Sequence, residues 1–324
     1  MIVGNNAKLQ IGKQTDFSTA VAQTLALEFT KETLKLVPAY MSSDALVGRK
    51  ATSRMDLAAL KVAGDFEIIC NPDNMGPLLA FLFGDEASPA AVSGSAVYDH
   101  VFSPISAVSA SSLFKTTIAV DRGAAIKGFV GCKIDSMKLS VKPKDYLRAT
   151  FSVIGRSEET DTIDAVALST KLPFQFIHGS VTVDAVAYAE ITGIDFTYKN
   201  NLEDDLFVLN GTQYMIEIEP QAREVTASLS VNYSSTTEAT RAAKFAAGTA
   251  CAIVLTFQST ETVLAGKYYT MTISIPTAYI TAMDPNVGGP ERIKMNMEVK
   301  GTETASAQVC QITLRDGRAT KWVA

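Results

Sequence analysis

The sequence has 324 residues, of which 47% are hydrophobic and 19% are charged, so it can bury the cores of two ordinary domains and is not disordered. Its 29 Lys and Arg residues stand against 34 Asp and Glu residues without a basic run, which argues against an affinity for nucleic acid. Residues 1–8 lack the layout of a signal peptide, and the longest apolar stretch near the middle, 78–83, is too short to span a bilayer. We therefore expect a soluble protein that is made in a cytoplasm and has no membrane partner.

Alternation of apolar and polar residues predicts β-strands along most of the chain. Each predicted strand has one apolar face and one face of Thr, Ser, Asn and mixed charges, which is typical of antiparallel sheets with one wet face. The clearest runs are 137–141, 151–153, 269–275, 295–299 and 310–314. The cysteines also fall in strand-like segments, and because no Cys-x-x-Cys pair is present we expect buried free thiols at Cys70, Cys132, Cys251 and Cys310.

Two helices are predicted from their end signals. The first begins with Asn71 as N-cap and Pro72 at the first helical position, and it ends at Gly84. The second begins at Ser235, where Glu238 three residues later completes a capping box, and it ends at Gly248.

These two helices mark an internal repeat, because the distance from cap to terminal glycine is 13 positions in both (84 − 71 and 248 − 235). Neighbouring segments match in the same order: 62–71 with 225–234, 27–30 with 194–197, 114–120 with 269–275, and 147–155 with 293–301. The offset falls from about 164 at the helices to 146 at 301 − 155, so the first copy carries an extra loop, which we place at 85–112. Chance similarity between two β-rich halves is the alternative explanation.

The predicted organisation follows from the repeat. An N-terminal arm (1–19) precedes a first domain (20–160), and a linker (161–184) leads to a second domain (185–318) and a C-terminal tail (319–324).

The sequence favours no catalytic or ligand-binding site. His100 and His178 fall in different domains, and no nucleophile elbow accompanies them. The acidic run 203–205 lacks the ligand spacing of a calcium loop, and residues 287–290 lack that of a phosphate loop. Trp322 is interpreted as a packing anchor. We therefore predict a protein that is not an enzyme, with no catalytic residues, no cofactor and no metal.

The order of several segments resembles the tail tube proteins of long non-contractile-tailed phages. The segments that carry the resemblance are 32–49, 62–69, 71–74 and 78–84, followed by the closing strands 292–301 and 309–315. The resemblance implies a mainly β fold with two tandem tail-tube-like β-sandwich or barrel domains, each with one flanking α-helix. In that family six single-domain subunits form a ring whose strands make a continuous barrel, and a long loop after the first strands reaches a neighbouring ring. Two copies in one chain would then give three chains per ring with pseudo-sixfold symmetry.

The function that the resemblance implies is structural. The chain would be the major tail tube subunit of a virion, assembled in the host cytoplasm into homotrimeric, pseudo-hexameric rings stacked around a lumen. DNA would pass through this lumen without specific binding. Partners would be other copies of the chain and the tape measure, tail terminator and tail tip proteins. The alternatives are another virion component, such as a head decoration or tail tip protein, and a carbohydrate-binding surface protein.

One hypothesis goes beyond the family. The loop after the first strand is basic in the first copy and acidic in the second, where the residues are Arg49, Lys50 and Arg54 against Glu203, Asp204 and Asp205. Since complementary potentials set register at interfaces, we expect these ring-stacking candidates to align rings or domains. The alternative is that both loops are merely solvated.

Overall fold

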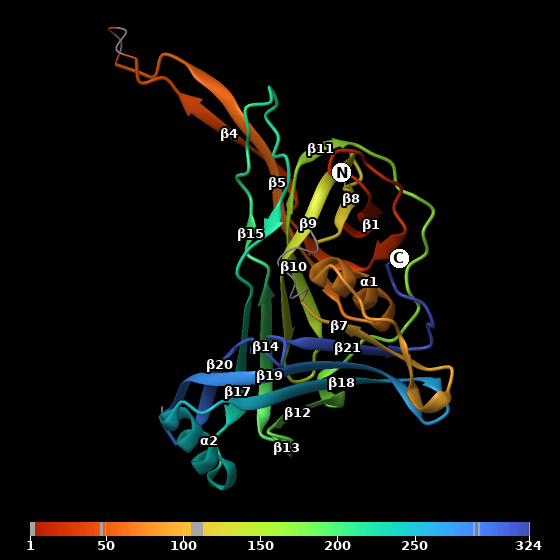
Figure 1. Ribbon diagram of the computed structural model, residues 1–324, viewed down its shortest axis with the longest axis vertical. Coiled ribbons are helices and arrows are strands. Elements are labelled where there is room, and N and C mark those ends of the chain that lie inside the picture. Colours follow the sequence, from red (N-terminus) through yellow and green to blue (C-terminus); the bar gives the residue numbers. More distant parts are fainter. Residues whose placement is uncertain are drawn as a thin grey trace.

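The computed structural model describes residues 4–45, 48, 50–104, 113–287, 289–290 and 292–323. The described chain is mainly β, as expected, with two α-helices set against its sheets. Figure 1 shows an elongated body from which one long hairpin projects at the upper left.

A central antiparallel sheet runs through both halves of the chain in the order β4–β5–β10–β9–β14–β17–β20–β19, with β3 preceding β4 along β5. The pair β9–β14 joins the first half to the second, with Leu139 opposite Phe196. The strands are β3 (Phe29–Glu32), β4 (Lys35–Ser42), β5 (Met55–Ile69), β9 (Ile126–Val141), β10 (Arg148–Gly155), β14 (Ile191–Lys199), β17 (Glu224–Asn232), β19 (Lys267–Asn286) and β20 (Lys294–Gly301).

Two outer sheets grow from the long strands β9 and β19, whose N-terminal parts leave the central sheet. The first has the order β2–β1–β8–β9–β11, and the second has the order β6–β7–β21–β19–β18–β12–β13. Their strands are β1 (Lys8–Gln14), β2 (Leu25–Leu27), β6 (Ala90–Ala91), β7 (Tyr98–Phe102), β8 (Lys115–Asp121), β11 (Ser157–Thr160), β12 (Gly179–Val183), β13 (Val186–Ala187), β18 (Cys251–Leu264) and β21 (Gln311–Asp316). A separate short pair, β15 (Leu202–Glu203) and β16 (Glu219–Pro220), completes the set, with 3-10 turns η1 (Gly4–Asn6), η2 (Val92–Gly94) and η3 (Phe176–His178).

The core lies between the central sheet and the outer sheets. Burial alternates residue by residue in β10, β17 and β20, which confirms the predicted period of two. Phe66 and Phe151 stack across β5 and β10 with ring centroids 5.3 Å apart, on the buried face of the central sheet. The opposite face carries the Thr, Ser and charged residues.

The first helix forms as predicted. In α1 (Pro72–Phe83) the Asn71 side chain accepts from the Asn74 N–H and the Asn74 side chain accepts from the Asn71 N–H, while Gly84 closes the helix at φ 78°. The second helix, α2 (Ser235–Ala247), begins at Ser235 as predicted, but its N-cap is Ser234, which makes no side-chain cap bond and instead donates its hydroxyl to Glu190. The side chains of Ser235 and Glu238, on which the predicted capping box depends, lie outside the described part of the chain.

The ladders correct the proposed repeat upstream of the helices. Glu32 pairs with Phe66 and Ile194 pairs with Leu229, and Phe66 and Leu229 are themselves equivalent. Glu32 is therefore the counterpart of Ile194, and the match of 27–30 with 194–197 is wrong.

The match of 114–120 with 269–275 is also wrong. Ile118 of β8 pairs with Phe129, and Ile253 of β18 pairs with Ile275, so β8 corresponds to β18 and not to β19. A period of two is common to every half-buried strand, so pattern matching cannot distinguish one strand from its neighbour.

Three segments outside the predicted domain cores form regular structure. Residues 8–14, expected in an N-terminal arm, form β1 and pair along their whole length with β8. Residues 179–183, expected in the linker, form β12 on the edge of β18. The expected extra loop at 85–112 contains β6, η2 and β7, of which β7 pairs with β21 from the end of the chain; residues 105–112 lie outside the described part.

Candidate assembly interface

The central sheet ends in two strand edges that have no partner strand within the described chain. At one end, β3 and β4 pair only with β5, and at the other the C-terminal part of β19 pairs only with β20. The corresponding edges of β9 and β14 pair with each other inside the chain. Open edges of this length are templates for pairing with another chain.

An ion pair lies on the β3–β4 edge. Arg122, from the turn between β8 and β9, donates to both carboxylate oxygens of Glu32 at 2.7 and 2.9 Å and to the Leu34 carbonyl at 2.5 Å. The Leu34 N–H donates to Glu32 at 3.1 Å. The hydrogen bonds and charge of Glu32 hold the pKa of Arg122 above its usual value, against the opposing effect of burial. Leu34, the counterpart of Phe196, thus has both backbone groups occupied by side chains of its own chain.

The β4–β5 hairpin, which we call the arm, extends well beyond the body (Figure 1). Paired residues continue out to Ser42 and Met55, and at ~3.3 Å per residue the stretch from Lys35 to Ser42 spans ~23 Å. Its end exposes Tyr40, Met41 and Met55.

The equivalent segment of the second half, residues 200–223, does not extend freely but lies along the root of the arm. We call it the brace. The Leu60 N–H donates to the Gln213 carbonyl at 2.8 Å, and the Gln213 amide donates to the Leu57 carbonyl at 3.2 Å. Met215 and Ile218 of the brace are buried in a small cluster with Phe17, Leu113 and Leu202.

A buried ion-pair network fixes the brace to the first half. Glu217 lies 2.9 Å from Lys115 and 2.9 Å from Lys133, whose side chain is 0% exposed and also donates to the Ile218 carbonyl at 2.6 Å. Burial lowers the pKa of Lys133, and Glu217 only partly offsets this. Although burial acts in the opposite direction, the hydrogen bonds from Lys115 and Lys133 hold the pKa of Glu217 below its usual value.

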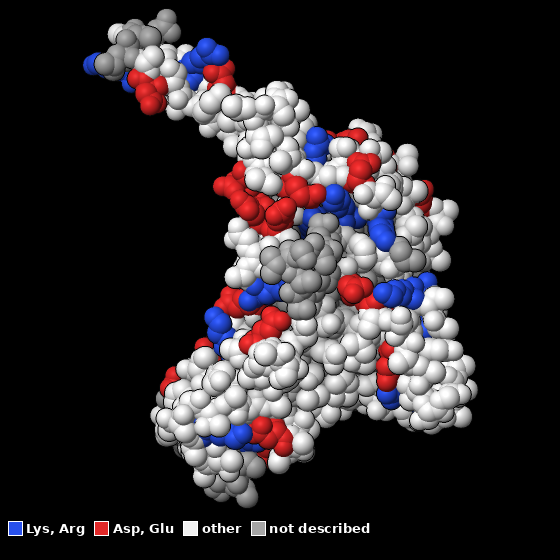
Figure 2. All heavy atoms as spheres, viewed as in Figure 1, with Lys and Arg blue, Asp and Glu red and all other residues white. Residues whose placement is uncertain are grey.

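The residues proposed as ring-stacking candidates fall into two separate places. Lys50 and Arg54 lie at the exposed end of the arm, where Arg54 pairs with Asp56, whereas Arg49 lies outside the described residues. Asp204 pairs with Lys61 at the arm's root, and acidic side chains gather there (Figure 2), where the brace carries Glu203, Asp204, Asp205, Glu217 and Glu219. The structure therefore does not bring the basic and acidic sets together within the chain.

The polar face of the central sheet carries charges in pairs. Arg148 lies 3.2 Å from Glu67, Lys138 lies 3.5 Å from Asp195, and Lys300 lies 3.0 Å from Glu224. Between them stand hydroxyl residues such as Thr226, Ser228 and Ser230. The sequence predicted the polar face but gave no signal for its cross-strand ion pairs, because the partners come from different strands.

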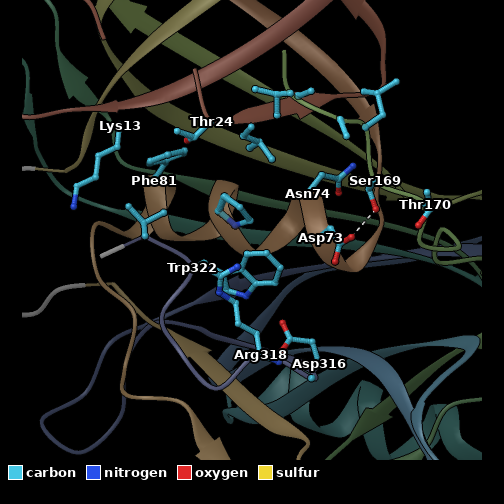
Figure 3. Close-up of a pocket in the computed structure, with 18 of the residues that line it drawn as sticks. Lys13, Thr24, Asp73, Asn74, Phe81, Ser169, Thr170, Asp316, Arg318 and Trp322 are labelled. Atoms are coloured by element: carbon cyan, nitrogen blue, oxygen red, sulfur yellow. Dashed lines mark hydrogen bonds between the residues drawn. The ribbon is translucent and has the colours of Figure 1, made fainter. Parts of the chain in front are cut away.

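A groove of about 890 Å³ lies beside α1, lined by the helix, by residues 166–170 and by the C-terminal tail (Figure 3). Trp322 from the tail lies against Gly76, where an added Cβ would stand 2.3 Å from the indole, and Ser169 donates to Asp73 at 2.8 Å. The indole packs against the core, as predicted, and the Arg318 guanidinium lies 4.8 Å from its centre.

Beneath this groove His100 joins three distant segments. Its Nδ1 lies 2.5 Å from Glu86 and its Nε2 lies 2.9 Å from Asp316, while Glu86 also accepts from the Trp322 N–H at 2.7 Å. Burial alone would lower the pKa of His100, but the hydrogen bonds and charges of Asp316 and Glu86 raise it to about 9. This arrangement ties the tail to β7 and to the end of α1.

In the part of the chain that the structure describes, no group of three or more His, Cys, Asp or Glu residues could hold a metal ion, and no helix is long and apolar enough to cross a membrane. The four cysteines are free and buried, as predicted, and burial raises the pKa of each thiol. His178 lies half-buried in η3.

The two open edges, the arm and the paired charges are features of an assembling sheet protein. A family model described as phage tail tube protein matches residues 4–307, nearly the whole chain. The chain belongs to the phage tail tube family. No curated protein matches it. The family match spans both halves of the central sheet, including the β9–β14 junction, and identifies the chain as a structural component of a phage tail.

Proposed function

We propose that this tail tube protein forms stacked rings of three chains around a lumen that conducts DNA. The observation that carries the proposal is the pair of open edges at the two ends of one continuous sheet. Pairing each edge with that of a neighbouring copy would close the sheet into a barrel and leave no free edge.

The polar face of the central sheet would line the lumen. Three of its cations stand beside carboxylates, at Arg148–Glu67, Lys138–Asp195 and Lys300–Glu224. Since unpaired Lys and Arg bind phosphate by releasing counterions, pairing them keeps DNA from adhering to the wall.

The count of three chains rests on reading the chain as two copies of one domain. Strands β1 to β11 correspond in order and pairing to β12 to β21 once β6 and β7 are set aside as an insertion and β15 and β16 as part of the brace, with β3 and β4 together matching β14. We place the copies at residues 8–160 and 179–316, and six such copies in a ring require three chains.

The two helices also support contact between neighbouring chains of the ring. In the first copy, α1 is covered by β7, β21 and Trp322, all of which follow it in the chain, and 11 of its residues are buried. In the second copy the outward face of α2 exposes Ala239, Ala242, Ala243 and Ala246. The next chain in the ring would cover this face as β21 and Trp322 of the second half cover part of α1.

The arm would contact the adjacent ring, and its basic end would meet the acidic patch at the arm's root in a neighbouring chain. Reversing the charge of Arg49, Lys50 and Arg54 together should impair tube growth and leave the thermal unfolding of the subunit unchanged. Normal tubes from this variant would show that both regions are merely solvated.

Electron microscopy of the concentrated, purified chain tests the main proposal. Hollow tubes whose rings contain three chains are the expected result. A stable single particle that does not polymerise at any concentration, or discrete trimers as in a decoration protein, would refute it.

A further inference from the structure

We infer that the joint between neighbouring chains has one defined register, in which Leu34 of one copy lies opposite Pro285 of the next and Lys35 lies opposite Asp284. The inference rests on the proposed ring and specifies its chain-to-chain contact. The partner is a second copy of this chain.

The register comes from the joint that already exists inside the chain. There, Leu139 lies opposite Phe196 and Lys138 lies opposite Thr197. Leu139 and Lys138 of β9 have Pro285 and Asp284 of β19 as their counterparts, because their ladder partners lead across the sheet to equivalent positions of β5 and β17. Pairing with equivalent positions of β5 and β17 likewise makes Leu34 and Lys35 the counterparts of Phe196 and Thr197. Transferring the pairing to the open edges gives the stated register.

The direction of the backbone groups agrees with this pairing. Groups along a strand point alternately to its two neighbours, and Thr33 donates to Asp65 of β5 at 2.8 Å, so Leu34 points its groups to the open edge. When this alternation is followed from one ladder partner to the next across the sheet, the backbone groups of Met283 and Pro285 also point to the open edge of β19.

Pro285 supplies an independent argument. Because proline has no N–H, it cannot donate to the carbonyl opposite it, and in a paired strand this would leave that carbonyl unsatisfied. The carbonyl that the register places there is Leu34, and it already accepts from Arg122 at 2.5 Å. The Arg122 side chain therefore replaces the donor that Pro285 lacks, and on assembly the Leu34 N–H would exchange its bond to Glu32 for one to the Pro285 carbonyl.

The β9–β14 joint inside the chain needs no side chain in place of a missing N–H, and it lacks the proline and the ion pair. At the position of Pro285 this joint has Leu139, and at the position of Glu32, which holds Arg122 in place, it has Ile194. The guanidinium and the proline occur together only at the edges left open in the described chain.

Charge gives a third argument. Lys35 and Asp284 are both exposed on the polar face, and directly opposite residues of an antiparallel pair have Cβ atoms about 4.5–5.5 Å apart. A shift by two residues would place Lys35 opposite Ala282 and lose this ion pair.

A disulfide trap tests the register in assembled tubes. The double variant Lys35→Cys with Asp284→Cys should give a disulfide between chains on mild oxidation, because opposite residues fall within the Cα separation that a disulfide allows. The matched control, Lys35→Cys with Ala282→Cys, has the same number of thiols on the same face and should give at most a tenth of the yield. Equal yields, or a higher yield from the control, would overturn the register.

A rescue experiment tests the role of Arg122. Arg122→Ala should raise the concentration needed for tube formation about fivefold, as expected for one lost hydrogen bond of about 1 kcal/mol. Adding Pro285→Ala should restore assembly, because the new N–H can donate to Leu34. Thermal unfolding of the dilute subunit should show no such rescue. Additive effects of the two substitutions in tubes would refute the proposed replacement.

The outcomes separate this inference from the proposed function. Tubes that form but carry the cross-link only in the control pair would contradict the register and would still be consistent with the proposed tube function. Failure of the unmodified chain to form tubes refutes both.

Discussion

Replacing Glu217 by Gln should detach the brace from the first half of the chain. The substitution retains the shape of the side chain and an acceptor oxygen but removes the charge that lies between Lys115 and Lys133. Lys133 is the more sensitive partner, because its side chain is 0% exposed and, in the described part of the chain, its ammonium group bonds only to Glu217 and the Ile218 carbonyl.

The magnitude follows from this geometry. Two unit charges 2.9 Å apart attract by about 6 kcal/mol at an effective dielectric constant of about 20. Water reaches Glu217, which is 24% exposed, so part of the loss is recovered by solvation of Lys133 in a loosened brace. Breaking a buried pair typically costs about 3–5 kcal/mol, and we expect about 3 kcal/mol here.

Chemical denaturation of the dilute subunit, followed by circular dichroism, measures this loss. Glu219→Gln, on the exposed part of the same segment, is the control and should change the free energy of unfolding by less than about 0.5 kcal/mol. Combining Glu217→Gln with Lys133→Met should restore most of the stability, because no buried charge then remains unpaired. If Glu217→Gln costs no more than the control, the network does not fix the brace.

Three further predictions follow from other contacts. Gly76→Ala should destabilise the subunit by about 1–3 kcal/mol in thermal unfolding, because its Cβ would stand 2.3 Å from the Trp322 indole, and it should be tolerated when combined with Trp322→Ala. His100 has its pKa raised from 6.5 to about 9, so its contribution, of about 3 kcal/mol, should be complete below pH 6.5 and lost as the pH rises through 9; His100→Gln should abolish this dependence in pH-resolved unfolding. Ala243→Glu, on the exposed face of α2, should block tube formation in sedimentation assays without lowering subunit stability, and unimpaired tubes would place this face at the surface of the tube.

Local chemistry made much of the fold predictable from the sequence. The alternation in residues 137–141 and 295–299 identified strands with one polar face, since a half-buried strand imposes a period of two. Asn71, Pro72 and Gly84 identified the first helix, because each fits a particular backbone position at a helix end. The order of these elements was also sufficient to indicate the tail tube family.

Tertiary structure alone decided which strand lies beside which and where each charge finds its partner. The repeat was misaligned at 27–30 and 114–120, because any half-buried strand has the same period and only the ladder sets its register. The brace contacts, the His100 contact with Asp316 and the Arg122 bond to Leu34 join residues that are 84 or more positions apart, and no local pattern encodes such pairs. Residue type and period determine what each strand is, whereas the pairing of distant strands determines which edges stay open for a second copy.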